Sequence, residues 1–391
     1  MKGKKMKFYK RYYICKILVY VSVWFFLMTG QYYQAFADEP SGQTIRIISD
    51  EEMPIILDLI ANQVRDNYER IITWSGEIDV KLNWLHTGAI AQEMFKFTDA
   101  KGEPPVAILQ KVEEKTVFVI DANKNYVYID NFREKPSKFL NHTTGKDLGN
   151  SGSHPYWSTL IAKPDFLLKA TPQSLDRKEN KIIRRKAVKR PSPQKELRTG
   201  FYEGIISDPR RIFMPGTIPT WDYHDILIKK INRYGKIEFD GYSLQMEERI
   251  KGDVIEYKII EPAVVSLERS DPNHYVILTK IFSSRCGFNM TYLEAATGSG
   301  MVFQKFTWEY ELINGVYLPK RVVRKDYNSN GEVSSEKDCT YTNSKLNQKI
   351  PAETFEYTNL KLKDGNIFID EILKKEYRYK GATKTLEPTE K

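Results

Sequence analysis

A strict alternation of apolar and polar residues over 74–84 constrains the fold of this chain most. Its apolar positions are Trp74, Gly76, Ile78, Val80, Leu82 and Trp84. A period of two is the pattern of a β-strand that has one face on a core or a ligand and the other face in water. A strand of this length needs neighbours on a sheet, so the sequence predicts a fold built around a large sheet.

Further strand patterns follow, with turn residues between them. The segments are 94–98, 106–111, 116–120, 126–130, 247–251, 254–260, 264–268, 275–282, 287–293, 302–312, 316–326 and 333–342. Asn314-Gly315 is the strongest hairpin signal among them, because an Asn-Gly pair suits the tight turn between two antiparallel strands. Consecutive short strands with such turns predict an antiparallel meander.

One helix precedes the strands. Ser49 and Glu52 form a capping box, and Pro54 stands in the first turn. Apolar residues then recur at helical spacing up to about Ile72. The sequence therefore predicts a single main helix that leads directly into the first long strand.

The middle of the chain, 132–235, lacks this regularity. It contains nine prolines and two stretches that look helical, 166–169 and 222–232. We interpret it as an insertion or cap on the sheet. Its basic run, 177–198, is either a helix on the surface or a solvated loop, and we expect the loop because charge runs are often mobile. The other interpretation is contact with an anionic membrane surface.

The net charge of +9 belongs to two segments. Residues 1–37 carry seven basic residues and no acidic one, the run 177–198 carries a charge of +8, and the remainder carries −6. Because the basicity is not spread over a folded surface, it does not indicate a nucleic-acid binder.

The first basic segment has the pattern of a cleaved signal peptide. An apolar run over 17–28 follows the basic residues, and Ala35-Phe36-Ala37 matches a cleavage site. The apolar run is short for a membrane span, although an uncleaved anchor is the alternative. Gln31 stands where a lipid-bearing cysteine would be needed, so we expect an exported, periplasmic protein that is not lipidated, with the mature chain starting after Ala37.

Catalytic and metal-binding patterns do not emerge from the sequence. The five histidines, His86, His142, His154, His224 and His274, have no metal-ligand spacing, and phosphate-loop, dinucleotide and hydrolase motifs are missing. We therefore expect no metal, no cofactor and no enzyme activity. A hydrolase whose carboxylates converge only in space stays as a lesser alternative.

Two cysteines remain after cleavage, Cys286 and Cys339. In an oxidising compartment they could pair, and both lie in segments that resemble strands. The alternative is two free, buried thiols. The sequence leaves these two outcomes open.

Aromatic residues on the apolar faces of long strands are the remaining candidate for a site. The candidate residues for an apolar ligand cavity are Trp74, Ile78, Trp84, Phe306, Trp308 and Tyr310. Ordinary core packing explains aromatics as well. However, a long sheet with a single main helix has much apolar face to cover, and a lined concavity could take an acyl chain.

A resemblance to a known family rests on the order of the elements and on three C-terminal segments, 308–320, 341–347 and 350–355. In these features the chain resembles the LolA/LolB-like periplasmic lipoprotein carriers, which include the outer-membrane lipoprotein-sorting proteins. The resemblance covers about 49–131 and 236–370. It implies a mainly β (α+β) fold, in which a curled antiparallel sheet forms an unclosed β-barrel that holds an apolar ligand, with helices as a lid. No functional residue of the family maps onto this chain by motif.

These patterns together predict three regions: a signal peptide at 1–37, a LolA-like domain at 38–374 with 132–235 inserted, and a polar tail at 375–391. The expected function is to bind an acyl chain, a lipid or a lipoprotein in the periplasm. The alternative is an interaction or sensing module of the envelope on the same fold, with another envelope protein as partner.

Overall fold

The computed structural model describes residues 44–124, 126–133, 135–150, 156–176, 181–191, 238–239, 242–264 and 275–389. The chain divides into two units, Met1–Gln43 and Thr44–Lys391, and the described residues all belong to the second. The predicted signal peptide with its cleavage site after Ala37, and the predicted helix at 222–232, lie outside the described residues and stay predictions.

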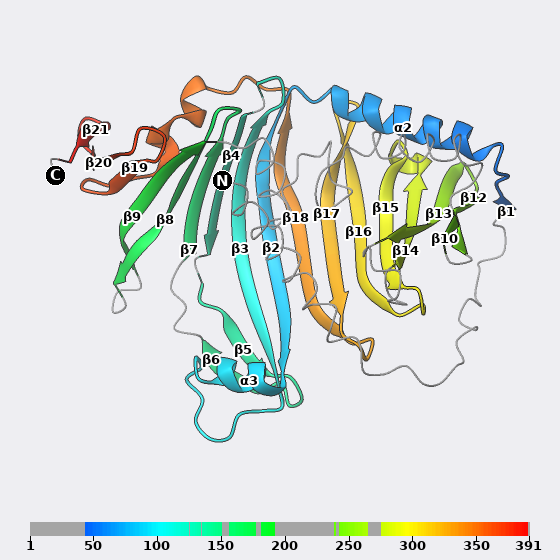
Figure 1. Ribbon diagram of the computed structural model, residues 1–391, viewed down its shortest axis with the longest axis horizontal. Helices are drawn as coiled ribbons and strands as arrows, with labels where there is room; N and C mark the ends of the chain where they lie inside the picture. Colours follow the sequence, from blue (N-terminus) through cyan, green and yellow to red (C-terminus); the bar gives the residue numbers. More distant parts are fainter. Residues whose placement is uncertain are drawn as a thin grey trace, which may run out of the picture. The chain divides into compact units, whose positions relative to one another are not determined.

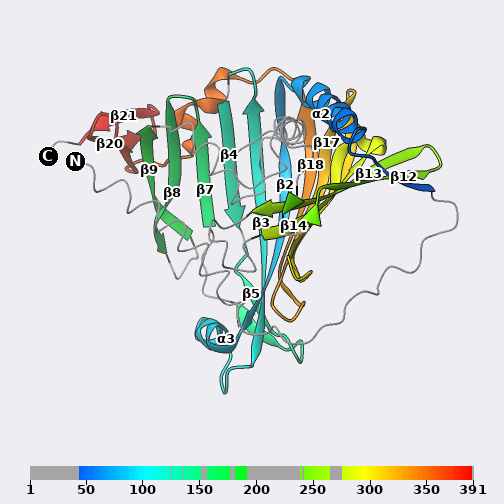
Figure 2. The same ribbon diagram turned by 45° about the vertical axis from the view of Figure 1, so that its right-hand side comes forward.

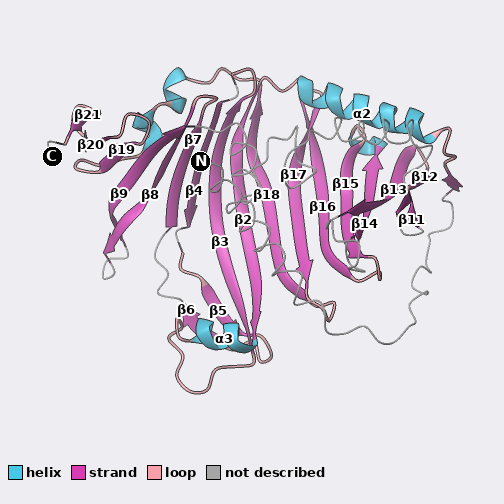
Figure 3. Ribbon diagram, in the orientation of Figure 1, coloured by secondary structure: helices cyan, strands magenta, loops and turns pink. Residues whose placement is uncertain are grey.

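Most of the described residues form β-strands (Figures 1 and 3). Nineteen of these strands belong to one sheet. The first ones are β1 (Thr44–Ile47), β2 (Thr73–Thr87), β3 (Ala107–Asp121), β4 (Tyr126–Arg133), β5 (Lys138–Asn141), β6 (Asp147–Asn150), β7 (Tyr156–Ala162), β8 (Phe166–Asp176) and β9 (Lys181–Pro191). The later ones are β12 (Gln245–Lys251), β13 (Val254–Val264), β14 (Tyr275–Ser283), β15 (Asn289–Thr297), β16 (Val302–Ile313), β17 (Val316–Tyr327), β18 (Val333–Leu346), β19 (Ile367–Asp370), β20 (Lys375–Lys380) and β21 (Thr385–Pro388). A separate pair consists of β10 (Glu238–Phe239) and β11 (Tyr242–Ser243).

The pairings give the spatial order β1-β12-β13-β14-β15-β16-β17-β18-β2-β3-β4-β7-β8-β9, and every neighbouring pair in this series is antiparallel. The short strand β5 pairs with the N-terminal part of β3, at residues 108–111, and β6 pairs with β5. In the described part of the chain, no pairing joins β1 to the other end of the sheet. The predicted mainly β fold with an antiparallel sheet that does not close into a barrel is confirmed.

Helix α2 (Met53–Glu69) lies across one end of strands β12 to β17 (Figures 1 and 2). It buries Ile56, Leu57, Ile60, Val64 and Tyr68 against the sheet. The predicted capping box forms one turn ahead of Met53: the Ser49 hydroxyl accepts a hydrogen bond from the Glu52 N–H at 3.3 Å, and the Glu52 carboxylate accepts one from the Ser49 N–H at 3.3 Å. The principal core of the protein lies between α2 and the sheet.

A second core lies on the opposite face of the sheet. Ile129 of β4 belongs to the principal core, whereas its neighbour Tyr128 belongs to the second one, because successive residues of a strand face opposite sides. Phe355 of η3 (Ala352–Phe355), Leu360 of η4 (Tyr357–Leu360) and Phe368 of β19 pack here. The C-terminal segment therefore covers the face of β4, β7 and β8 that α2 does not.

The structure differs from four local predictions. Residues 94–98 were expected as a strand, but helix α3 (Gly88–Phe95) ends there, because Ala91 packs into a small core of its own. Residues 166–169 were expected as helical and belong to β8. The described part of the basic run is β9, neither a helix nor a loop. Within the predicted polar tail, β20 and β21 form a hairpin.

Pairing explains the strands in the middle of the chain. Residues 156–191 contain β7, β8 and β9, which extend the principal sheet beyond β4. β9 also pairs in parallel with β19, and Lys189 and Arg190 of the basic run form ion pairs with Asp370 (3.3 Å) and Glu371 (3.0 Å). The local sequence is rich in Leu and Lys, but neighbouring strands decide its conformation.

Candidate apolar ligand site

The six predicted site residues belong to, or pack against, the one apolar cluster that also contains the buried face of α2. Trp74, Ile78 and Trp84 come from β2, and Phe306, Trp308 and Tyr310 come from β16. Only β17 and β18 separate these two strands in the sheet. The register places Trp308, Val322, Cys339 and Val80 opposite one another in a single row, which explains why aromatics far apart in sequence meet on one face.

The six residues differ in how deeply they are buried. Trp74 and Ile78 are fully buried and Trp308 is 6% exposed, whereas Trp84, Phe306 and Tyr310 are half-buried against the same cluster. Trp74 packs edge-on against Phe118, with ring centroids 4.6 Å apart. The Phe306 and Trp308 rings are stacked at 5.4 Å. The buried members belong to the principal core, and the half-buried ones pack at its border.

Two side chains fasten α2 to the sheet near its C-terminal end. Asn67 is buried; its amide donates to the Tyr317 carbonyl at 3.0 Å and accepts from the Tyr317 N–H at 2.7 Å. Asn347 accepts from the N–H groups of Ile72 (2.8 Å) and Thr73 (3.2 Å) and donates to the Arg70 carbonyl at 2.8 Å. Asn67 thereby satisfies backbone groups of β17, and Asn347 satisfies those between the end of α2 and the start of β2.

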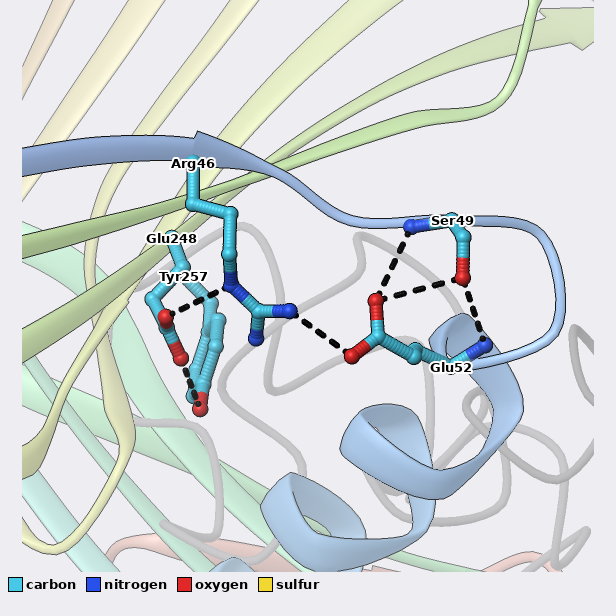
Figure 4. Close-up of polar contacts among 5 residues, drawn as sticks. All are labelled: Arg46, Ser49, Glu52, Glu248 and Tyr257. Carbon is cyan, nitrogen blue, oxygen red and sulfur yellow. Dashed lines mark hydrogen bonds and ion pairs between the residues drawn. The ribbon is translucent and has the colours of Figure 1, made fainter.

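A polar network holds the other end of the helix (Figure 4). Arg46 of β1 donates to Glu52 at 2.7 Å and to Glu248 of β12 at 3.1 Å, and the Tyr257 hydroxyl donates to Glu248 at 3.0 Å. The hydrogen bond from Arg46 lowers the pKa of Glu52, while burial and then Glu248 raise the pKa of Tyr257 to about 12. The network links the edge strand, β12, β13 and the start of α2.

Cationic side chains occupy a row of the same face that the sequence did not reveal. Lys280, Arg324 and Lys337 share this side of the sheet with the aromatic cluster. The register places Arg324 opposite both Phe306 and Lys337, and it places Leu293 opposite both Phe306 and Lys280. Lys280 is buried and pairs with buried Glu261 at 2.7 Å. Lys337 has the parity of buried Cys339 and Tyr341, but that signal alone did not place it on this face, because a charged residue in a strand is normally assigned to the solvent side.

The two cysteines are free and buried, so the structure contains no disulfide between them. Cys286 lies in η2 (Ser284–Cys286), directly before β15, and Cys339 lies in β18. Three strand spacings separate β15 from β18, about 14 Å along the sheet, whereas a disulfide needs Cα atoms within about 7 Å. Burial raises the pKa of each thiol to about 12.

The described residues contain no group of three or more His, Cys, Asp and Glu side chains that could hold a metal ion. The same part of the chain has no helix long and apolar enough to cross a membrane.

No family profile and no curated protein sequence matches the chain. Among solved structures, it is similar to a LolA superfamily protein from Nitrosomonas europaea (10% identity, TM-score 0.33, 77% of this chain and 97% of that one). It is also similar to an outer membrane lipoprotein-sorting protein domain from Vibrio parahaemolyticus (7%, 0.33, 80% and 99%) and to a DUF1329 family protein from Desulfovibrio piger (9%, 0.31, 79% and 98%). The first two carry the names of the family that the C-terminal segments resemble. At such TM-scores, these likenesses carry no argument about function.

Proposed function

We propose that this protein is an exported periplasmic protein that holds an acyl chain of a lipid or lipoprotein between α2 and the sheet. The observation that carries the proposal is the aromatic cluster beneath α2, whose half-buried border residues Trp84, Phe306 and Tyr310 continue into buried Trp308. A chain that enters beside Phe306 would meet the buried ring of Trp308 next, because the two rings are stacked.

The required affinity is within reach of apolar burial alone. Each buried methylene group contributes about 0.8 kcal/mol. A micromolar complex needs about 8 kcal/mol, so burial of roughly ten methylene groups would be enough. A chain of ordinary fatty-acid length supplies that number.

Helix α2 is the element that would have to move to admit the ligand. In this proposal the buried ring of Trp308 on β16, one of the strands that α2 crosses, becomes accessible when α2 moves away from the sheet. The helix is fastened by few polar contacts, chiefly Asn67 in its last turns and the Arg46 network before its first turn. In this proposal α2 is the lid, and its displacement couples ligand entry and release to a change in lid position.

The test is a fluorescence titration of the purified protein with a polyene fatty acid whose emission rises in an apolar site. Phe306→Ala removes a half-buried ring that stacks on Trp308, and we expect it to weaken binding about tenfold or more. Leu312→Ala is the matched control, because Leu312 lies on the same strand but is 59% exposed. Failure of the wild-type protein to bind, or equal loss in both variants, would refute the proposal.

A further inference from the structure

The aromatic cluster borders on a pair of cations that face each other across two strands. Lys337 of β18 and Arg324 of β17 are register partners, and Phe306 of β16 is the next residue along the same row. Like charges directly opposite each other destabilise a sheet. The pair therefore calls for a negative charge near both side chains.

In the described structure only one of them has a direct ion pair. The Arg324 guanidinium pairs with Asp326 on its own strand at 3.0 Å. The Lys337 ammonium has no ion pair and no hydrogen bond to any described residue, although its side chain is partly buried. The Glu114 carboxylate, which lies on the same face, is engaged by Arg133 at 2.5 Å.

Burial is what makes the unpaired ammonium costly. Lys337 lies between buried Cys339 and half-buried Ser335 in the inward series of β18 and opposite buried Leu82 of β2. Desolvation lowers the pKa of Lys337 and the charge of Arg324 adds to this effect, while the charge of the Glu114 carboxylate offsets part of it. An anion bound here would give Lys337 a direct ionic partner, which Glu114 does not provide while it is paired with Arg133, in surroundings with a low dielectric constant.

The position of the pair connects it to the apolar cluster. The Arg324 guanidinium carbon lies 5.6 Å from the centre of the Phe306 ring, and that ring stacks on Trp308. Two residues along a strand span about 7 Å, so the row of Arg324 and Lys337 lies about 7 Å from the row of buried Trp308. A charged headgroup on the cations would therefore leave the attached chain beside the aromatic rings. An amphiphile could thus place its charged end on the cations and its chain on the rings.

We propose that Lys337 and Arg324 bind the carboxylate or phosphate headgroup of an amphiphile whose acyl chain lies on the aromatic cluster. The inference rests on the proposed function and deepens it, because it names an anionic single-headgroup lipid as the class of ligand. Lys337 supplies the unpaired ammonium, and Arg324 can share its remaining N–H groups between Asp326 and the headgroup.

The experiment measures displacement of an uncharged fluorescent acyl probe by dodecanoate, dodecyl phosphate and methyl dodecanoate, with the full chain at constant ionic strength. A charge-assisted hydrogen bond makes a difference of about 10- to 100-fold in affinity. We therefore expect both anionic ligands to bind at least about tenfold more tightly than the ester. Lys337→Met should reduce this ratio to near one and leave the affinity for the ester unchanged.

Lys320→Met is the control, because Lys320 lies on β17 with an exposed side chain. It should keep the wild-type ratio. Thermal unfolding of Lys337→Met should show no loss of stability, since the change removes a desolvated charge.

The outcomes separate the headgroup site from the function itself. If no ligand displaces the probe and the probe itself does not bind, the proposed function fails. If ester and acid bind wild-type protein equally, or if Lys337→Met weakens both equally, the headgroup site is wrong while the function stands. If inorganic phosphate binds as tightly as dodecyl phosphate, the cations hold a free anion and the amphiphile proposal is overturned.

Discussion

Replacing Asn67 by alanine tests how α2 is fastened to the sheet. Asn67 makes two hydrogen bonds with the backbone of Tyr317, at 3.0 and 2.7 Å, from a position that is 6% exposed. The pairing of β17 with β18 begins at Arg321, so no residue of β18 pairs with Tyr317. The Asn67 amide instead bonds to the Tyr317 backbone. The substitution leaves a backbone N–H and a carbonyl without these partners.

The expected cost follows from those two groups. Each unsatisfied backbone group costs about 1 to 3 kcal/mol, so Asn67→Ala should lower the free energy of unfolding by about 3 kcal/mol. Urea unfolding followed by circular dichroism measures this change, and hydrogen exchange should show faster opening of α2 than of β2. The interpretation of α2 as a separately fastened lid predicts that exchange accelerates mainly in the helix.

Gln63→Ala is the matched control, because Gln63 lies on the same helix with an exposed side chain. It should change the stability by less than about 0.5 kcal/mol. If Asn67→Ala is as mild as the control, the two hydrogen bonds do not hold the helix and the reasoning is refuted.

Two further predictions concern buried groups. Glu261→Gln removes the carboxylate 2.7 Å from buried Lys280 and should lower the free energy of unfolding by about 3 to 5 kcal/mol near neutral pH. Because burial lowers the pKa of Lys280 in the folded state, the unfolded state binds the proton more tightly. The stability of the variant, measured by urea unfolding, should therefore recover as the pH rises to about 10. Cys286 and Cys339 should resist a thiol-specific reagent in the folded protein and should react with it in urea without reductant, which peptide mapping can show. If both stay unreactive in urea, they form a disulfide and the prediction is wrong.

The large features of the fold were predictable because they depend on long, regular patterns. The alternation that starts at Trp74 and the Asn314-Gly315 turn correspond to β2 and to the hairpin of β16 and β17. Residues 166–169 were not predictable in this way, since Leu and Lys favour a helix and only pairing with β7 and β9 makes them a strand.

The aromatic part of the candidate site could be predicted, but its charged border could not. Trp74 and Trp308 are visible in the sequence as apolar members of alternating strands. Lys337 and Arg324 interrupt that alternation, and a charged residue in a strand is normally assigned to the solvent face. Only the register with Cys339 and Phe306 shows that these cations share the face of the aromatic cluster.

Native mass spectrometry of the gently purified protein tests the central claim most directly. We expect a population whose mass exceeds that of the chain by one acyl-bearing molecule. Organic extraction should release that molecule and identify its headgroup as anionic. Phe306→Ala should reduce this population, and Leu312→Ala should not. A bare protein under conditions that preserve lipid complexes, together with no uptake of added dodecanoate, would contradict the account.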